Sequence, residues 1–218
     1  LRRISQAPYL FFFNFDSFAL AGASPEKIIS VQGREIESMP IAGTRKKGSL
    51  DPGLLNDPKE IAEHVMLVDL ARNDVGSVAL PGTVRVAEFR AVYHFSHVEH
   101  MISRVVGTLR LECDALDALK ASFPAGTLTG APKIRAMELI EELELSKRGL
   151  YGGAIIAIEA NGNLASCIAI RTALFTEGKM FVRAGAGIVL DSDPMKEADE
   201  TVFKASAILE AAYAFNHR

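Results

Sequence analysis

The stretch that decides the fold is "DPKEIAEHVMLVDLARN" at residues 57–73, which lies between segments of strand-like sequence. Proline is favoured at the first position of a helix, and an aspartate just before it can accept hydrogen bonds from the first turn. Glu60 follows Asp57 by three residues, which is the spacing of a capping box. We therefore expect a helix from about residue 58 to residue 73, capped by Asp57.

Stretches rich in Phe, Ile, Val and Leu predict strands on both sides of this helix. They lie at 9–20, 27–38, 80–110, 152–159, 166–174 and 179–184. Two further helices are expected, at 131–145 with Ile134, Met137, Ile140 and Leu143 on or near one face, and at about 194–214. This mixture of strands and helices predicts an α+β fold.

The composition indicates a globular chain with a sizeable core. It has 218 residues, of which 49% are hydrophobic and 23% charged, so we expect a single domain over residues 1–218. The net charge of −3 argues against a nucleic-acid or anionic-membrane surface. No uncharged apolar run approaches the roughly 18 residues of a membrane span. The chain begins at Leu1 and enters strand-like sequence almost at once, so we expect the C-terminal portion of a longer chain.

Cysteine usage points to a reducing compartment. Cys113 and Cys167 are the only cysteines, and they form neither a disulfide framework nor a CxxC motif. We expect both to be free thiols, and we expect the protein in the cytoplasm.

Two segments place a pair of glutamates three residues apart just after a proline. "PKEIAEH" at 58–64 holds Glu60 and Glu63, and "PMKEADET" at 194–201 holds Glu197 and Glu200. Residues three apart share one helix face, and carboxylate oxygens are the ligands that Mg²⁺ prefers. Glutamate in a first turn is also favoured by the helix dipole alone. The pairs are thus either two ordinary helix starts or two halves of one metal site.

Three histidines lie close together in "YHFSHVEHM" at 93–101. Their three-residue spacing would suit a zinc-binding helix, but the surrounding sequence predicts a strand, in which side chains alternate between faces. His97 would then point to the face opposite His94 and His100. We expect no zinc triad, and either one functional histidine or a buried structural one.

"FPAGTLTGAPKIRAME" at 123–138 is the most distinctive stretch. It lacks the spacing of a phosphate-binding loop, but Gly126, Thr127, Thr129 and Gly130 lead into the expected helix. Free backbone N–H groups at such a helix start favour an anion, for which a carboxylate would serve. Glycine also allows a ligand to approach the backbone closely.

Arg171 stands in "IAIRTALF", within an expected strand of otherwise apolar residues. A buried guanidinium needs an anionic partner, since an unpaired buried charge is costly. A substrate carboxylate or a carboxylate of the protein would supply a two-point contact. Gly185 and Gly187 lie in a second glycine-rich turn, "RAGAGIVLDSDP" at 183–194, where small residues can also serve tight packing.

Taken together, the motifs resemble those of the chorismate-binding enzymes, and most closely the large subunits of anthranilate synthases. The resemblance covers about residues 8–212, and its motifs are "PIAGTRKKG", "KEIAEHVMLVDLARNDVG", "HVEHMISRVVG", "FPAGTLTGAPKIRAME", "YGGA", "IAIRTA" and "AGAGIVLDSDPMKEADET". The family fold implied by the resemblance is an α+β sandwich of two sheet layers with outer helices. It binds its substrate and Mg²⁺ between the layers.

The resemblance also implies roles for the glutamate pairs. Glu63 and Glu200 resemble the Mg²⁺ ligands of the family, and Glu60 and Glu197 resemble the carboxylates that hold metal-bound waters. Lys204, four residues after Glu200, can balance this negative charge.

Other residues match the family's catalytic and substrate-binding positions. Glu26 of "SPE" resembles the general acid that protonates the departing ring hydroxyl, and His100 resembles the histidine beside the ring. The residues that resemble the carboxylate-binding group and the pocket walls are Tyr151, Arg171 and Gly185, with Thr127, Gly43, Thr44 and Gly187.

The family resemblance implies a reaction as well. Aminodeoxychorismate synthases that use a lysine nucleophile read "PIKGT", whereas this chain has Ala42 at that position, which implies direct attack by ammonia. The implied activity is Mg²⁺-dependent conversion of chorismate and ammonia to anthranilate and pyruvate in tryptophan biosynthesis. A glutamine amidotransferase subunit would supply the ammonia in a hetero-oligomer. The alternatives are an aminodeoxychorismate, isochorismate or salicylate synthase, or an inactive chorismate-binding fragment.

Overall fold

The structure is a computed structural model that describes residues 1–46, 54–94, 98–190 and 192–216. The chain divides into two compact units, and each is described by itself. The first unit comprises Leu1–Pro25, Glu141–Ile155 and Cys167–Arg218. The second comprises Glu26–Ile140 and Ile156–Ser166.

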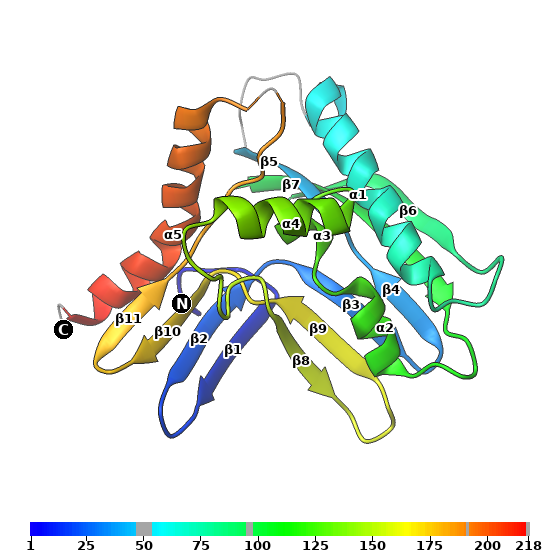
Figure 1. Cartoon of the computed structure of the whole chain (residues 1–218), viewed down its shortest axis with the longest axis horizontal. Helices are drawn as coiled ribbons and strands as arrows, with labels where there is room; N and C mark the ends of the chain where they lie inside the picture. Colours follow the sequence, from blue (N-terminus) through cyan, green and yellow to red (C-terminus); the bar gives the residue numbers. More distant parts are fainter. Residues whose placement is uncertain (47–53, 95–97, 191, 217–218) are drawn as a thin grey trace. The chain divides into compact units, whose positions relative to one another are not determined.

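The first unit contains a four-stranded antiparallel sheet of order β1-β2-β10-β11 and the helix α5 (Figure 1). The bounds are β1 Tyr9–Asn14, β2 Ala19–Ser24, β10 Thr172–Thr176, β11 Lys179–Val182 and α5 Pro194–Asn216. The expected single strand over 9–20 is a hairpin instead, because the chain turns where Phe15 N donates to Phe18 O at 2.9 Å. The small residues of β2 make room for β1, since a Cβ on Gly22 would lie 2.2 Å from the Phe11 ring.

The second unit holds most of a seven-stranded sheet of order β5-β7-β4-β3-β9-β8, with β6 paired to β7. The bounds are β3 Lys27–Gln32, β4 Glu35–Ser38, β5 Ile41–Lys46, β6 Arg85–His94, β7 Val98–Thr108, β8 Ala154–Ile158 and β9 Leu164–Ile168. The expected strand over 27–38 is again two strands. Gly33 makes the turn between them at a φ of 57°, a conformation that glycine adopts at little cost.

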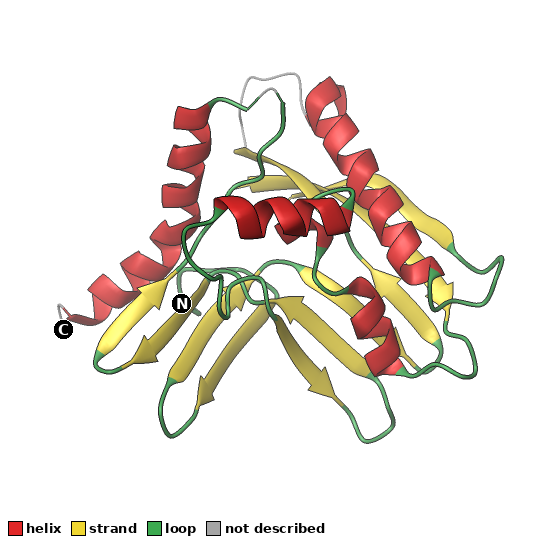
Figure 2. Ribbon diagram, viewed as in Figure 1, coloured by secondary structure: helices red, strands yellow, loops and turns green. Residues whose placement is uncertain are grey.

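Helices cover one face of this sheet (Figure 2). Helix α1 packs against β5 and β7, α2 packs against β3, and the two helices contact each other. The bounds are Leu54–Asn56 for a 3₁₀ turn, Pro58–Gly76 for α1, Ala115–Ser122 for α2, Gly126–Thr129 for α3 and Lys133–Leu143 for α4. The core between helices and sheet includes Leu67, Val68, Val75, Ile29, Val31, Ile36, Met101 and Val105.

The predicted start of α1 is confirmed. Glu60 N donates to Asp57 Oδ1 at 3.3 Å, and Ile61 N donates to Asp57 O at 3.0 Å. Helix α4 exists as expected, but no residue in it is buried, and Ile134 and Leu143 are 72% and 75% exposed. Of the apolar face predicted for this helix, Ile134 and Leu143 are therefore exposed, whereas Met137 and Ile140 are half-buried.

Both cysteines are free thiols. Cys167 is buried, and burial raises the pKa of its thiol to about 11, so it is protonated and unreactive at neutral pH. In the part of the chain that the structure describes, we find no helix with the length and apolarity to cross a membrane.

Candidate active site

Four of the predicted substrate-binding residues lie together in the first unit. Arg171 Nη1 donates to the carbonyl oxygen of Lys204, and Lys204 Nζ donates to the carbonyl oxygen of Gly185 at 3.3 Å. A Cβ on Gly185 would lie 2.9 Å from the hydroxyl oxygen of Tyr151, so glycine lets the Tyr151 side chain approach the backbone. Residues as far apart in the sequence as Tyr151 and Lys204 thus form one cluster.

The prediction that Arg171 stands within a strand is wrong. The run at 166–174 divides into β9 and β10, and Arg171 lies between them with a φ of 51°. Its carbonyl oxygen accepts a hydrogen bond from Ala23 N at 3.0 Å. The left-handed backbone costs a non-glycine residue about 1–2 kcal/mol. Such strained residues are found most often at functional sites.

The guanidinium of Arg171 is available for an anion. Arg171 is half-buried, and burial lowers its pKa below the ordinary value although it remains charged. Among the described residues, no carboxylate forms an ion pair with it. Burial also raises the pKa of Tyr151, so its phenol stays protonated and can donate a hydrogen bond. Both groups suit a ligand carboxylate.

A charged network that sequence reasoning missed holds Tyr151. Glu144 accepts from Arg148 Nη2 at 2.6 Å and from Arg183 Nη2 at 2.7 Å. The guanidinium of Arg148 lies over the Tyr151 ring, 5.9 Å from its centroid. The four-residue spacing of Glu144 and Arg148 was visible in the sequence, but the approach of Arg183 from a distant segment was not.

Helix α5 begins in the same way as α1. Asp193 Oδ1 accepts from Met195 N and Lys196 N, both at 3.0 Å, and Asp193 O accepts from Glu197 N at 3.0 Å. Glu200 Oε1 is 2.5 Å from Lys204 Nζ, as the sequence predicted, with side chains 46% and 32% exposed. An ion pair so exposed contributes little to stability. Stability therefore does not explain why a carboxylate stands at position 200.

A hollow of about 350 Å³ lies beside the start of α5. Its walls are mostly apolar and include Ile188 and Val189, with Glu197 as the charged member. Gly187 stands in the exposed turn next to Ile188, where an added Cβ would meet nothing within 4 Å. The glycine-rich turn thus lies beside a ligand-sized hollow, although space alone does not require glycine at position 187.

In the second unit, His64 fixes the glutamate-bearing end of α1 to the sheet. His64 is fully buried, and its Nε2 is 2.6 Å from Ser103 Oγ of β7. Ser103 Oγ also accepts from Arg90 N at 2.9 Å. Burial, followed by the charge of Arg90, lowers the pKa of His64 to about 4, so the ring is neutral at neutral pH. Glu60 and Glu63 on this part of α1 are half-buried.

His100 lies on β7 opposite Thr44 of β5, so the structure makes these two predicted residues neighbours on paired strands. Residues three apart on a strand point to opposite faces. Since Ser103 points toward α1, His100 points to the other face of β7. The structure does not describe His97, the side chains of Thr44 and His94, or the surroundings of Gly43. The predicted arrangement of the three histidines therefore stays a prediction.

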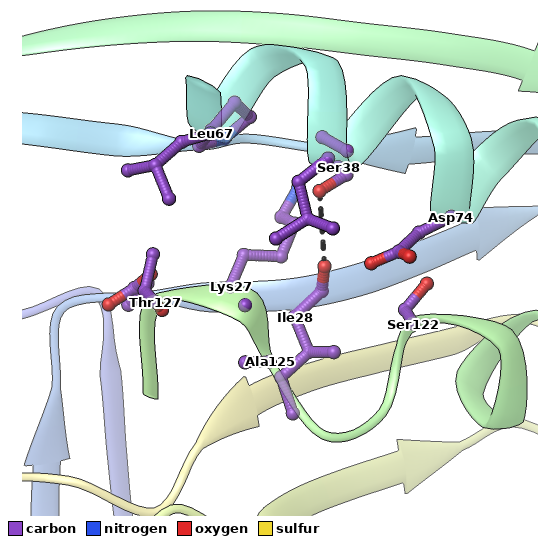
Figure 3. A pocket seen from close by; sticks show the side chains of 13 residues that line it. Lys27, Ile28, Ser38, Leu67, Asp74, Ser122, Ala125 and Thr127 are labelled. Atoms are coloured by element: carbon purple, nitrogen blue, oxygen red, sulfur yellow. Dashed lines mark hydrogen bonds between the residues drawn. The ribbon is translucent and has the colours of Figure 1, made fainter. Parts of the chain in front are cut away.

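Glu26 and Thr127 line one small cavity in the second unit (Figure 3). Glu26 comes just before β3, and β2 ends at Ser24. The cavity has a volume of about 40 Å³, which admits a few water-sized molecules and no larger ligand. Its other walls are Lys27, Ile28, Ser38, Pro40, Leu67, Leu70, Ala71, Asp74, Ser122, Ala125 and Gly126.

The donor chemistry fits Mg²⁺ in part. Each unit offers one pair of glutamates at a spacing of three on a helix, and such oxygen donors suit a hard cation. Within the described residues, neither unit gathers three of His, Cys, Asp or Glu into a cluster that could hold a metal. Neither pair makes a complete metal site in its own unit.

The comparison with known proteins identifies the family. The model of the chorismate binding enzyme family matches residues 1–210. The chain belongs to this family. It is 52% identical over 218 residues to anthranilate synthase component 1 of Aquifex aeolicus, covering 97% of this chain and 44% of that protein. The chain thus spans less than half the length of this relative.

Solved structures agree with this assignment. Anthranilate synthase component I of Streptococcus pneumoniae matches with a TM-score of 0.87 at 46% identity, over 94% of this chain and 46% of that one. The menaquinone-specific isochorismate synthase of Escherichia coli matches with a TM-score of 0.79, over 90% of this chain and 47% of that one. Its identity is 24%, so this second likeness bears on the fold alone. The predicted chorismate-binding α+β fold with two sheets is confirmed.

Proposed function

We propose that this chain is the catalytic part of an anthranilate synthase, a lyase that converts chorismate and ammonia to anthranilate and pyruvate. The observation that carries the proposal is the cluster around Arg171, where among the described residues no carboxylate lies within ion-pair distance of the half-buried guanidinium, although the charge of Glu200 acts on it. Chorismate carries two carboxylates that such a group can bind. The identity of 52% to an anthranilate synthase component 1 supports this choice within the family.

In the proposed reaction, the first unit's cluster binds the enolpyruvyl carboxylate. Arg171 and Tyr151 donate hydrogen bonds to it, and Gly185 leaves room for the Tyr151 hydroxyl to lie against the backbone. Lys204 holds the Gly185 carbonyl in place and balances Glu200. We propose that Thr127, Gly43, Thr44 and Gly187 line the rest of the substrate pocket.

Glu26 and His100 are proposed to act at the ring of chorismate. Ammonia forms a bond to a ring carbon while the ring hydroxyl departs, and Glu26 donates the proton that lets it leave as water. The C–O bond between the ring and the enolpyruvyl group then breaks, and the ring loses a proton that ends on the methyl group of the released pyruvate, which leaves the aromatic product. His100 lies beside the ring in this proposal, on the sheet face away from α1.

We propose Mg²⁺ as the cofactor, with Glu63 and Glu200 as ligands and with Glu60 and Glu197 binding the ion through waters. When bound, the ion supplies positive charge that anchors and polarises a substrate carboxylate. Capping by Asp57 and Asp193 sets the register of the two helices, and so fixes where each glutamate pair stands on its own helix.

Ala42 supports the choice of ammonia as the nucleophile. It is buried on β5 opposite Met101 of β7, and its methyl group has no reactive atom. A protein nucleophile at this position is therefore absent, which fits direct attack by ammonia. The relatives are named component 1. We propose that a glutamine amidotransferase subunit supplies the ammonia in a cytoplasmic hetero-oligomer within tryptophan biosynthesis.

Pyruvate release tests the proposal. The full-length protein, given chorismate, Mg²⁺ and an ammonium salt, should release pyruvate only when ammonia is present, as followed by coupled lactate dehydrogenase. An isochorismate or aminodeoxychorismate synthase would release no pyruvate. A salicylate synthase would release it without ammonia, and an inactive chorismate-binding fragment would leave chorismate unconsumed.

Arg171→Lys should raise the chorismate KM about tenfold or more. Lysine keeps the charge but cannot make the planar two-point contact with a carboxylate. The matched control is Arg135→Lys, because Arg135 forms an exposed ion pair with Glu138 at 2.8 Å on α4. An unchanged KM for Arg171→Lys in steady-state kinetics would show that Arg171 has only a structural role.

A further inference from the structure

An ion pair between Asp74 and Lys133 remains outside the proposed chemistry. Asp74 lies near the end of α1, and Lys133 is the first residue of α4. Lys133 Nζ is 3.0 Å from one carboxylate oxygen of Asp74 and 3.2 Å from the other. The side chain of Lys133 is only 17% exposed and that of Asp74 only 12%. Burial raises the pKa of Asp74, and Lys133 opposes that rise, so desolvation offsets much of the attraction.

A second contact joins the same two parts of the chain. A Cβ on Gly126 would lie 1.9 Å from Leu70 Cδ2, so the backbone of segment 123–132 lies directly on α1. Leu70 and Asp74 are four residues apart and share one face of α1. This face therefore holds segment 123–132 at two points, Gly126 near its start and Lys133 just after its end.

Both contacts lie at the wall of the cavity that Glu26 and Thr127 share. Leu70 and Asp74 contribute to it from α1, and Gly126 and Thr127 contribute from segment 123–132 (Figure 3). Movement of the segment away from α1 would change the distance between Thr127 and Glu26. The position of Thr127 thus depends on the contacts that Gly126 and Lys133 make with α1.

We propose that the Asp74–Lys133 ion pair is a positioning device that holds segment 123–132 against α1 and so fixes Thr127 relative to Glu26. Asp74 and Lys133 are positioning residues, and neither takes part in the chemistry. The effect on chorismate rests on the proposed function, whereas the effect on the segment does not.

Two measurements on the full-length protein test the effect on segment 123–132 and the effect on chorismate separately. Backbone hydrogen exchange of segment 123–132 is measured without substrate, and chorismate KM and kcat are measured with ammonia and Mg²⁺. The variants are Lys133→Met, the double variant Asp74→Asn with Lys133→Met, and Lys133→Arg. The double variant leaves no unpaired buried charge, so it serves if Lys133→Met fails to fold. Arg104→Met is the control, since it breaks a 2.9 Å pair with Glu37, and neither of these two residues lines the cavity.

We expect exchange in segment 123–132 to accelerate about tenfold or more in the double variant, with β7 unchanged. KM should rise about tenfold while kcat changes less than about threefold. Lys133→Arg should restore both values, and Arg104→Met should change neither. Wild-type exchange in the segment, or equal acceleration throughout the second unit, would overturn the inference. A wild type that leaves chorismate unreacted would contradict the proposed function, and the exchange result would then decide this inference alone.

Discussion

Glu26→Gln should lower the turnover of chorismate about 10²–10⁴-fold while its KM changes little. Hydroxide is a poor leaving group, so a general acid must deliver a proton as the ring C–O bond breaks. Glutamine keeps the size and polarity of Glu26 but has no proton to give. Glu26 lies just before β3, outside the strand, where a side chain can reach a ligand without distorting the strand.

The measurement is kcat for chorismate with saturating ammonia and Mg²⁺, together with chorismate binding by calorimetry. Glu35→Gln is a suitable control, because Glu35 is an exposed carboxylate on β4 in the same unit. Bound chorismate without turnover is the expected behaviour of Glu26→Gln. Anthranilate formation at the wild-type rate would rule out Glu26 as the acid.

Glu63→Gln and Glu200→Gln should each lower activity at limiting Mg²⁺ by about 100-fold or more. An amide oxygen carries no net charge, so it binds a hard cation much more weakly than a carboxylate does. The loss of a charge-stabilising metal is worth several kcal/mol in such reactions. The fold should persist, because Glu63 is only half-buried and the Glu200–Lys204 ion pair is exposed.

Mg²⁺ titration by calorimetry gives a readout independent of activity. Glu60→Gln and Glu197→Gln should weaken binding less, by about 10-fold, because groups that act through ligands or waters have smaller effects. Glu138→Gln on the exposed face of α4 is the control and should bind Mg²⁺ normally. Wild-type Mg²⁺ affinity in either Glu63→Gln or Glu200→Gln would disprove the metal assignment.

Local chemistry explains which parts of the fold were predictable from the sequence. The start of α1 was predicted because Asp57 and Pro58 act within one turn of the helix. Helix α2 was missed, although Asp114 and Asp117 form a capping box at its start. The strand lengths were overestimated, since apolar runs continue through turns.

In the candidate site, too, local contacts were predictable from the sequence and contacts between distant segments were not. The pairing of Glu200 with Lys204 follows from helical spacing and was predicted. The left-handed backbone at Arg171 was not predictable, because it depends on where β9 ends and β10 begins. The contact of Gly126 with Leu70 was equally hidden, since it arises only when a distant segment packs on α1. The catalytic roles came from the family resemblance, and spacing alone left them open.

Product identity tests the central claim most directly. The full-length protein is incubated with chorismate, Mg²⁺ and nitrogen-15-labelled ammonia, and the products are identified by mass spectrometry. We expect anthranilate that carries the label, with pyruvate in equal amount, because Ala42 offers no lysine nucleophile and ammonia is the proposed one. Labelled aminodeoxychorismate, unlabelled isochorismate or salicylate, or unreacted chorismate would contradict it.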